Sequence, residues 1–215
     1  MIGGIRVKVC GLTSEGDAAA AAGIGADFLG FILYPKSPRY LPLAQFAEWR
    51  AQLPDLPKVA VLVTPSDAEL AAAEAAGFDF FQIHFPADHP ASAQAAVARF
   101  GARVWLAPKL PPEAELAPEL LSLAETWLLD TYRADSFGGT GHTGDWAKFR
   151  RYRELYPALR WVLAGGLAPE NVAAAVSLTR TQMIDVNSGV ESAPGRKDLV
   201  KLAALGAALK ASAAS

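Results

Sequence analysis

The chain has 215 residues, of which 52% are hydrophobic and 20% charged, and its formal net charge is -2. This length suits one hydrophobic core, so we expect a single domain over residues 1–215. A nearly neutral chain offers no basic surface for nucleic acid, and no apolar run reaches the roughly 18 residues that a membrane span needs. The single cysteine cannot form an internal disulfide, and the first residues lack the pattern of a secretion signal, so we expect a cytoplasmic protein.

Short β-rich runs alternate with helical stretches along the whole chain. The runs that predict strands cover residues 5–10, 27–33, 57–63, 78–84, 102–108, 126–130, 160–164 and 183–187. The stretches that predict helices cover residues 14–24, 42–53, 66–76, 90–100, 113–124, 145–156, 168–178 and 197–212. This pattern favours a closed (β/α)8 TIM barrel over an open doubly wound sheet, and the first turn lacks the G-x-G-x-x-G of a dinucleotide site.

Polar groups recur at the predicted ends of the strands. They are Cys10, Arg39 in the loop after the second strand, Gln82, His84, Asp130, the Gly165-Gly166 turn, and the segment from Asp185 to Gly189. Catalytic groups of (β/α)8 barrels lie at the carboxyl ends of the strands and in the loops that follow. We therefore expect these residues to share one site.

Glycines gather in the loops after the last three predicted strands. The relevant residues are Gly139, Gly141, Gly165, Gly166 and Gly189, with Ser188 beside the last. Glycine allows backbone N–H groups to approach a phosphate, and barrels often bind phosphate in the loops after the seventh and eighth strands. Each glycine by itself could equally close a tight turn. Together they predict a phosphate site and a small phosphorylated substrate.

Cys10 and Asp130 end the first and sixth predicted strands, roughly across the barrel mouth from each other. Asp130 follows an apolar run, and apolar surroundings raise the pKa of a carboxyl group so that it can donate a proton near neutral pH. The alternative is an aspartate that anchors a loop. Cys10 would remove a proton, whereas a free cysteine elsewhere is commonly buried and inert. Lys8 and the start of the next helix are only weak candidates for lowering the pKa of this thiol.

Lys8 lies two residues before Cys10, so both side chains point into the barrel. A buried ammonium needs a carboxylate, and Asp185 on the neighbouring eighth strand is the first candidate. Arg39 follows a rigid Ser-Pro step and could hold a planar carboxylate, although an exposed loop arginine is the alternative. The three histidines show no metal-ligand spacing; His84 is expected to line the pocket with Gln82.

Six segments resemble the phosphoribosylanthranilate isomerase family. They are VKVCGLT (7–13), GADFLGFILYPKSPRYL (25–41), FQIH (81–84), LLDTYRADSFGGTGHTGDW (128–146), LAGGLAPENV (163–172) and IDVNSGVESAPGRKD (184–198). The cysteine and the signature SGVE-x-x-P-G-x-K-D are together specific to that family. The resemblance implies an aldose–ketose isomerase of tryptophan biosynthesis, an intramolecular oxidoreductase that works without metal or cofactor.

The implied reaction is the Amadori rearrangement of N-(5-phosphoribosyl)anthranilate to 1-(2-carboxyphenylamino)-1-deoxyribulose 5-phosphate. By resemblance, Asp130 protonates the ribose ring oxygen, Cys10 removes the C2 proton, and Arg39 holds the anthranilate carboxylate. The phosphate would lie among Gly139, Gly141, Gly165, Gly166, Ser188 and Gly189, and the pocket would be supported by Lys8, Gln82, His84 and Asp185.

Several departures from the family pattern occur around the site. Family members commonly read LQLHG where this chain has FQIHFP (81–86), His142 replaces a lysine, Gly144 replaces an aromatic residue, and Asn187 replaces a serine. We expect altered affinity rather than altered chemistry.

Two other functions are kept as alternatives. A sister isomerase of histidine biosynthesis would be expected to carry an aspartate at the position of Cys10 and two related halves. A catalytically idle barrel that binds phosphorylated metabolites is the second. We expect a monomer or homodimer that binds neither nucleic acid nor membrane.

Overall fold

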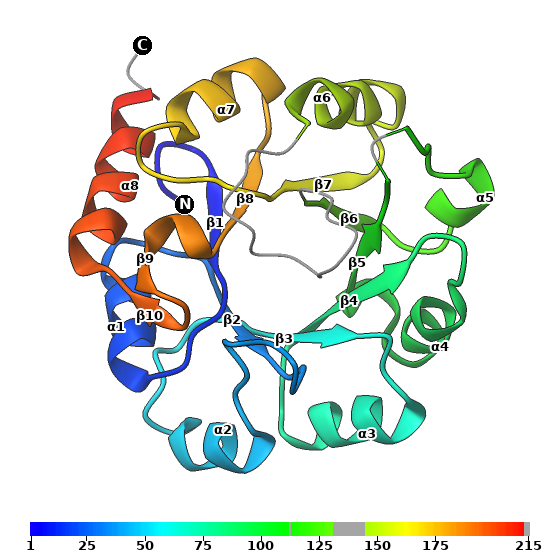
Figure 1. The fold of residues 1–215 in the computed structure, drawn as a ribbon, viewed down its shortest axis with the longest axis horizontal. Helices are drawn as coiled ribbons and strands as arrows, with labels where there is room; N and C mark the ends of the chain where they lie inside the picture. The colour runs from blue at the N-terminus through cyan, green and yellow to red at the C-terminus, as the bar shows by residue number, and fades with distance from the viewer. Residues whose placement is uncertain (112, 131–144, 213–215) are drawn as a thin grey trace.

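The computed structural model describes residues 1–111, 113–130 and 145–212. Eight parallel strands close into a barrel in chain order, which confirms the predicted (β/α)8 fold (Figure 1). The strands are β1 (Arg6–Val9), β2 (Phe28–Ile32), β3 (Lys58–Val63), β4 (Phe80–Pro86), β5 (Val104–Lys109), β6 (Thr126–Leu129), β7 (Arg160–Leu163) and β8 (Met183–Val186). Closure is direct, because β1 pairs with both β2 and β8.

Helices surround the barrel on its outside (Figure 1). They are α1 (Glu15–Gly23), α2 (Leu43–Trp49), α3 (Asp67–Ala75), α4 (Ala91–Phe100), α5 (Pro118–Leu121), α6 (Trp146–Leu155), α7 (Val172–Thr179) and α8 (Leu199–Ser212). Sequence signals fix some of the starts: Ser66 and Glu69 form a reciprocal capping box at α3. Within the described part of the chain, no helix has the length and apolar character to cross a membrane.

Three helices are several residues shorter than the periodicity predicts. The first is α2, which was predicted over 42–53 and ends at Trp49. The prediction of a helix over 113–124 is wrong for most of its length, because α5 starts only at Pro118. The residue before a proline is disfavoured in the helical region, and Ala117 is extended. Likewise α7 begins at Val172 rather than at residue 168, since the Asn171 side chain bonds backbone groups of the preceding loop.

Alternate residues of the strands fill the interior of the barrel. A separate cluster of buried side chains contains Val59, Trp105, Ala107, Leu128, Val162, Ala164 and Met183. The strand residues that line the cavity described below have the same parity, so both sets point inward. A layer of apolar side chains thus fills the barrel below a layer of polar side chains at the carboxyl ends of the strands.

A two-stranded hairpin that the periodicity does not predict follows β8. It comprises β9 (Glu191–Ala193) and β10 (Arg196–Lys197), and it lies beside α1 (Figure 1). The Thr13 hydroxyl donates to the carbonyl of Gly195, and the backbone N–H of Lys197 donates to the Asp17 carboxylate over 3.1 Å. The hairpin is therefore tied to the loop and helix that follow β1.

Candidate functional site

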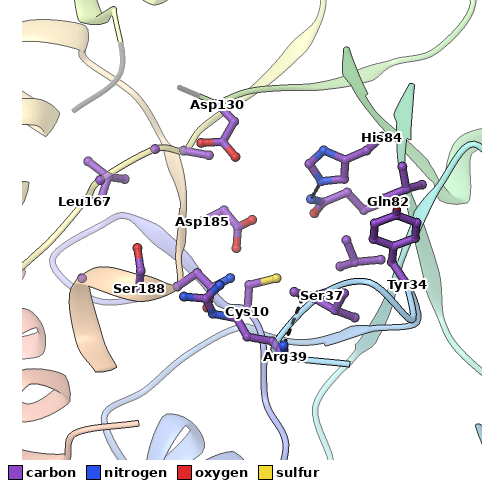
Figure 2. Close-up of a pocket in the computed structure, with 18 residues that line it drawn as sticks. Cys10, Tyr34, Ser37, Arg39, Gln82, His84, Asp130, Leu167, Asp185 and Ser188 are labelled. Carbon is purple, nitrogen blue, oxygen red and sulfur yellow. Dashed lines mark hydrogen bonds between the residues drawn. The ribbon is translucent and has the colours of Figure 1, made fainter. Parts of the chain in front are cut away.

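A cavity at the carboxyl ends of the strands brings together most of the predicted site residues (Figure 2). Its lining includes Cys10, Arg39, Gln82, His84, Asp130, Gly165, Gly166, Asp185, Ser188 and Gly189. Asn187 lines it as part of the predicted segment from Asp185 to Gly189, whereas Tyr34 and Ser37 also line it and were not among the predicted site residues. The predicted residues Gly139 and Gly141, and the departures His142 and Gly144, lie outside the described residues.

Lys8 and Asp185 form a buried ion pair, and Asp185 also lines the cavity. The Lys8 Nζ lies 2.9 and 3.0 Å from the two carboxylate oxygens of Asp185, as expected from their positions on adjacent strands. Burial works to lower the pKa of Lys8, but Asp185 and Cys10 outweigh it and leave that pKa above its usual value. Lys8 is therefore an ammonium, and its charge is balanced by Asp185.

The end of the Lys8 side chain also lies beside Cys10. Gly30 on β2 leaves the room for it, because a Cβ there would lie 2.9 Å from the Lys8 Nζ and 3.0 Å from the Cys10 Cα. Cys10 is buried, and burial raises the pKa of its thiol, while the Lys8 ammonium acts to lower it. The resting group is thus a thiol, and any thiolate formed from it has a cation next to it.

Gln82 and His84 lie on β4 at one side of the cavity. The Gln82 Nε2 lies 2.9 Å from the His84 Nε2. Burial, assisted by the Lys8 ammonium, lowers the pKa of His84 to about 4, so this ring is neutral near pH 7. The Gln82 Oε1 is buried without a hydrogen-bond partner among the described residues. It is an acceptor available to a bound ligand.

Asp130 lies directly after the end of β6, half-buried at the cavity wall. Figure 2 shows its carboxylate and the Cys10 sulfur on different sides of the cavity, with the Asp185 side chain between them in this view. The preceding Trp127 and Leu128 are buried, as the apolar run predicts. A carboxyl group and a thiol therefore line the same cavity.

Arg39 is held in the cavity wall by the β9–β10 hairpin. Its Nε lies 2.9 and 3.1 Å from the two Glu191 oxygens, and its Nη2 lies 2.8 Å from one of them. Arg39 is 8% exposed, which excludes the alternative of an exposed loop arginine. The buried Lys197 Nζ also contacts Glu191, over 3.0 Å. Burial works to raise the pKa of Glu191, but Arg39 and Lys197 outweigh it, so this pKa is lowered.

No role was predicted for Glu191 or Lys197 from the sequence. The signal that could have found them is the signature SGVE-x-x-P-G-x-K-D, which contains both residues. The contact between Glu191 and Arg39 joins residues 152 positions apart in the chain, so spacing alone could not reveal it.

The loops after β7 and β8 meet at one edge of the cavity. Gly165 and Gly166 have φ angles of 90° and 61°, which favour glycine. A Cβ on Gly189 would lie 2.0 Å from the Leu167 carbonyl oxygen, so glycine is required for the close approach of the two loops. Among the described residues, the backbone N–H groups of Gly165, Gly166, Ser188 and Gly189 have no acceptor. These donors are available to an anion.

Of the described histidines, His89 is exposed and pairs with Asp88. No three side chains of the His, Cys, Asp and Glu types come together as a metal site in the described ranges.

Comparisons with known proteins find phosphoribosylanthranilate isomerases both among curated sequences and among solved structures. The family model for N-(5'phosphoribosyl)anthranilate isomerase matches residues 7–207. The N-(5'-phosphoribosyl)anthranilate isomerase of Cereibacter sphaeroides is 41% identical over 209 residues, covering 94% of this chain and 96% of the relative. The solved phosphoribosyl anthranilate isomerase of Thermotoga maritima is 32% identical, with 96% of this chain and 99% of that one covered and a TM-score of 0.81.

A further solved isomerase of this kind was crystallised with reduced 1-(o-carboxyphenylamino)-1-deoxyribulose 5-phosphate. It is 31% identical to this chain, and the match covers 96% of this chain and 99% of that one, with a TM-score of 0.78.

Proposed function

The chain belongs to the phosphoribosylanthranilate isomerase family, and on that premise we propose that it converts N-(5-phosphoribosyl)anthranilate into 1-(2-carboxyphenylamino)-1-deoxyribulose 5-phosphate for tryptophan biosynthesis. The observation that carries the proposal is the shared cavity: Cys10, Asp130 and Arg39 line it together with the glycine loops after β7 and β8. A proton donor, a thiol, a cation and an anion cradle are the groups that this substrate and this rearrangement need.

In the first step, Asp130 donates a proton to the ribose ring oxygen. The C1–O bond breaks and its electron pair stays on that oxygen, while the anthranilate nitrogen shares its lone pair with C1 and forms a Schiff base. General acid catalysis of this kind typically contributes 10²–10⁴-fold. The position of Asp130, between a buried strand and the cavity, supports this role.

For the second step Cys10 must be ionised: its thiol proton passes to solvent, and the thiolate left beside the Lys8 ammonium then removes the proton from C2. The C–H electron pair becomes the C1=C2 double bond, and the C=N electrons return to nitrogen, which gives an enolamine. Transfer of the C2 hydroxyl proton and protonation of C1 then yield the ketone. The Lys8 ammonium would stabilise this thiolate by its positive charge, because it lies beside Cys10 in the space that Gly30 leaves open.

The rest of the cavity fits the remainder of the substrate. The free N–H groups of the loops after β7 and β8 would hold the 5-phosphate, and Arg39 would hold the aromatic carboxylate. The Gln82 Oε1 would accept a hydrogen bond from a sugar hydroxyl, which would satisfy its unpaired acceptor. A cytoplasmic monomer or homodimer is consistent with this role, and light scattering during size-exclusion chromatography distinguishes the two oligomeric states.

The test is an assay of the purified protein with freshly generated phosphoribosylanthranilate, followed by the loss of substrate fluorescence. We expect turnover by the wild type and loss of that turnover in Cys10→Ser. A wild-type protein that binds the substrate but does not consume it would refute the proposal and favour a barrel that only binds phosphorylated metabolites.

A further inference from the structure

The group around Arg39 contains more positive than negative charge. Arg39, Lys197 and Glu191 are 8%, 4% and 6% exposed, respectively, and both cationic side chains contact the Glu191 carboxylate. Two basic side chains therefore share one carboxylate. Burial, with the help of the Arg39 guanidinium, lowers the pKa of Lys197, and Glu191 opposes this shift. The remaining contacts of the Lys197 Nζ go to the carbonyl and side-chain oxygens of Asn187, which are uncharged. An uncompensated buried charge is costly, so this group favours the arrival of an anion.

The hydrogen bonds of Arg39 show where that anion would bind. Glu191 takes the Nε and Nη2 edge of the guanidinium. A guanidinium has five N–H donors in a fixed plane, and the Nη1 atom of Arg39 has no hydrogen-bond partner among the described residues. The outer edge formed by Nη1 and Nη2 therefore keeps donors for a planar, bidentate acceptor. Because Arg39 lines the cavity together with Cys10, that acceptor would be part of the substrate (Figure 2).

The Arg39 side chain has little freedom to leave this position. Gly11 lies against it: a Cβ there would lie 2.8 Å from the Arg39 Cδ and 2.5 Å from the Asn187 Oδ1. On the other side, Lys197 links Glu191 to Asn187, and the backbone of Lys197 is anchored on Asp17 of α1. The guanidinium is thus fixed between the β1–α1 loop and the hairpin.

We infer that Glu191, held by Lys197, is a positioning residue that aims the outer edge of Arg39 at the aromatic carboxylate of the substrate, so that the β9–β10 hairpin sets selectivity for a carboxylated aniline. The inference deepens the proposed function and rests on it. When the carboxylate binds, two cations face two carboxylates and the charge of the group is balanced.

The test compares two non-reacting ligands by calorimetry. One is reduced 1-(2-carboxyphenylamino)-1-deoxyribulose 5-phosphate, and the other is the same compound without the carboxylate. We expect the wild type to bind the carboxylated ligand about 10–100-fold more tightly, the scale of a charge-assisted bidentate contact. In Glu191→Gln this preference is expected to fall to about threefold or less, while affinity for the ligand without the carboxylate stays nearly constant.

The direction of the change separates positioning from simple charge. If Glu191 only neutralised Arg39, its removal would strengthen binding of the carboxylated ligand, which would overturn the inference. A merely structural role would weaken both ligands equally, and that result would also overturn it. Glu154→Gln, which removes an exposed partner of Arg150, is the matched control and is expected to leave the preference unchanged.

Two further measurements complete the design. In Glu191→Gln combined with Arg39→Ala, we expect the same preference as in Arg39→Ala alone, because Glu191 acts through Arg39. If Glu191→Gln does not fold, Lys197→Gln is used, and a preference unchanged from the wild type would overturn the inference. If the wild type binds neither ligand, the proposed function itself is refuted. If the wild type prefers the carboxylated ligand and Glu191→Gln keeps the same preference, only the role of Glu191 is refuted.

Discussion

Two buried charge groups lie at the same end of this barrel, and they are built differently. Lys8 and Asp185 come from adjacent strands and form a balanced pair, of which the Asp185 carboxylate lines the cavity. Arg39, Glu191 and Lys197 come from a loop and a hairpin, and their charges do not cancel. A balanced pair can influence a neighbouring thiol without attracting an anion of its own. An unbalanced group at the cavity wall is the place where a substrate carboxylate completes the charge.

The largest effect is expected when the Lys8 cation is removed from its pair with Asp185. Lys8→Met leaves the Asp185 carboxylate buried without its cation, and we expect the free energy of unfolding to fall by about 3–5 kcal/mol. Urea denaturation measures this loss. The exposed Lys210→Met is the control, and Lys8→Met combined with Asp185→Asn is expected to recover part of the stability. A loss below about 1 kcal/mol would show that the pair is not held as tightly as its distances indicate.

The next largest effect concerns the two groups that would transfer protons. We expect Cys10→Ser and Asp130→Asn each to lower kcat at least ~100-fold, as removal of a general base or acid does. The KM should change much less, because neither substitution alters the charge group at Arg39 or the glycine loops. Steady-state fluorescence kinetics measure both constants. Near-wild-type turnover in both variants would remove the acid–base assignment.

Arg39→Ala removes one cation from the second charge group and is expected to affect binding more than stability. The variant leaves Glu191 and Lys197 as a balanced pair, so we expect a smaller loss of unfolding free energy than in Lys8→Met, about 1–2 kcal/mol. Binding should suffer instead, with a KM raised about 10–100-fold and a smaller change in kcat. Parallel denaturation and kinetic measurements test both parts. Unchanged KM and kcat would remove the carboxylate role of Arg39.

The smallest effect is a pH dependence of stability from His84, which the Lys8 ammonium helps to keep neutral. Its pKa is lowered to about 4 from the usual 6.5, so the unfolded chain binds a proton between these values more readily than the folded protein. The stabilisation is present above pH 6.5 and is lost as the pH falls toward 4. We expect about 1–2 kcal/mol of this loss between pH 7 and pH 5. It should disappear in His84→Gln and persist in His89→Gln; equal pH dependence in all three proteins would contradict it.

The residues that could be predicted from the sequence are those fixed by strand periodicity. Lys8 on β1 and Cys10 just after it share a parity, and closure of the barrel places Asp185 beside Lys8, so the contact between Lys8 and Asp185 was predictable and is confirmed. The catalytic and binding roles of the cavity residues stay predictions.

The contacts of loops were not predictable in the same way. The bond between Arg39 and Glu191 depends on the conformation of two connections, and neither has a periodic pattern. The short α5 was not predicted either. The residues before it have a helical composition, but Pro118 disfavours a helical conformation at Ala117, which is extended.

One measurement tests the central claim most directly: kcat/KM of the purified wild type for phosphoribosylanthranilate beside the corresponding aminoaldose of histidine biosynthesis. The balanced pair beside a cysteine and the surplus charge at Arg39 predict turnover of phosphoribosylanthranilate, with a strong preference for it over the histidine-pathway substrate. Turnover of only the histidine-pathway substrate would contradict the account.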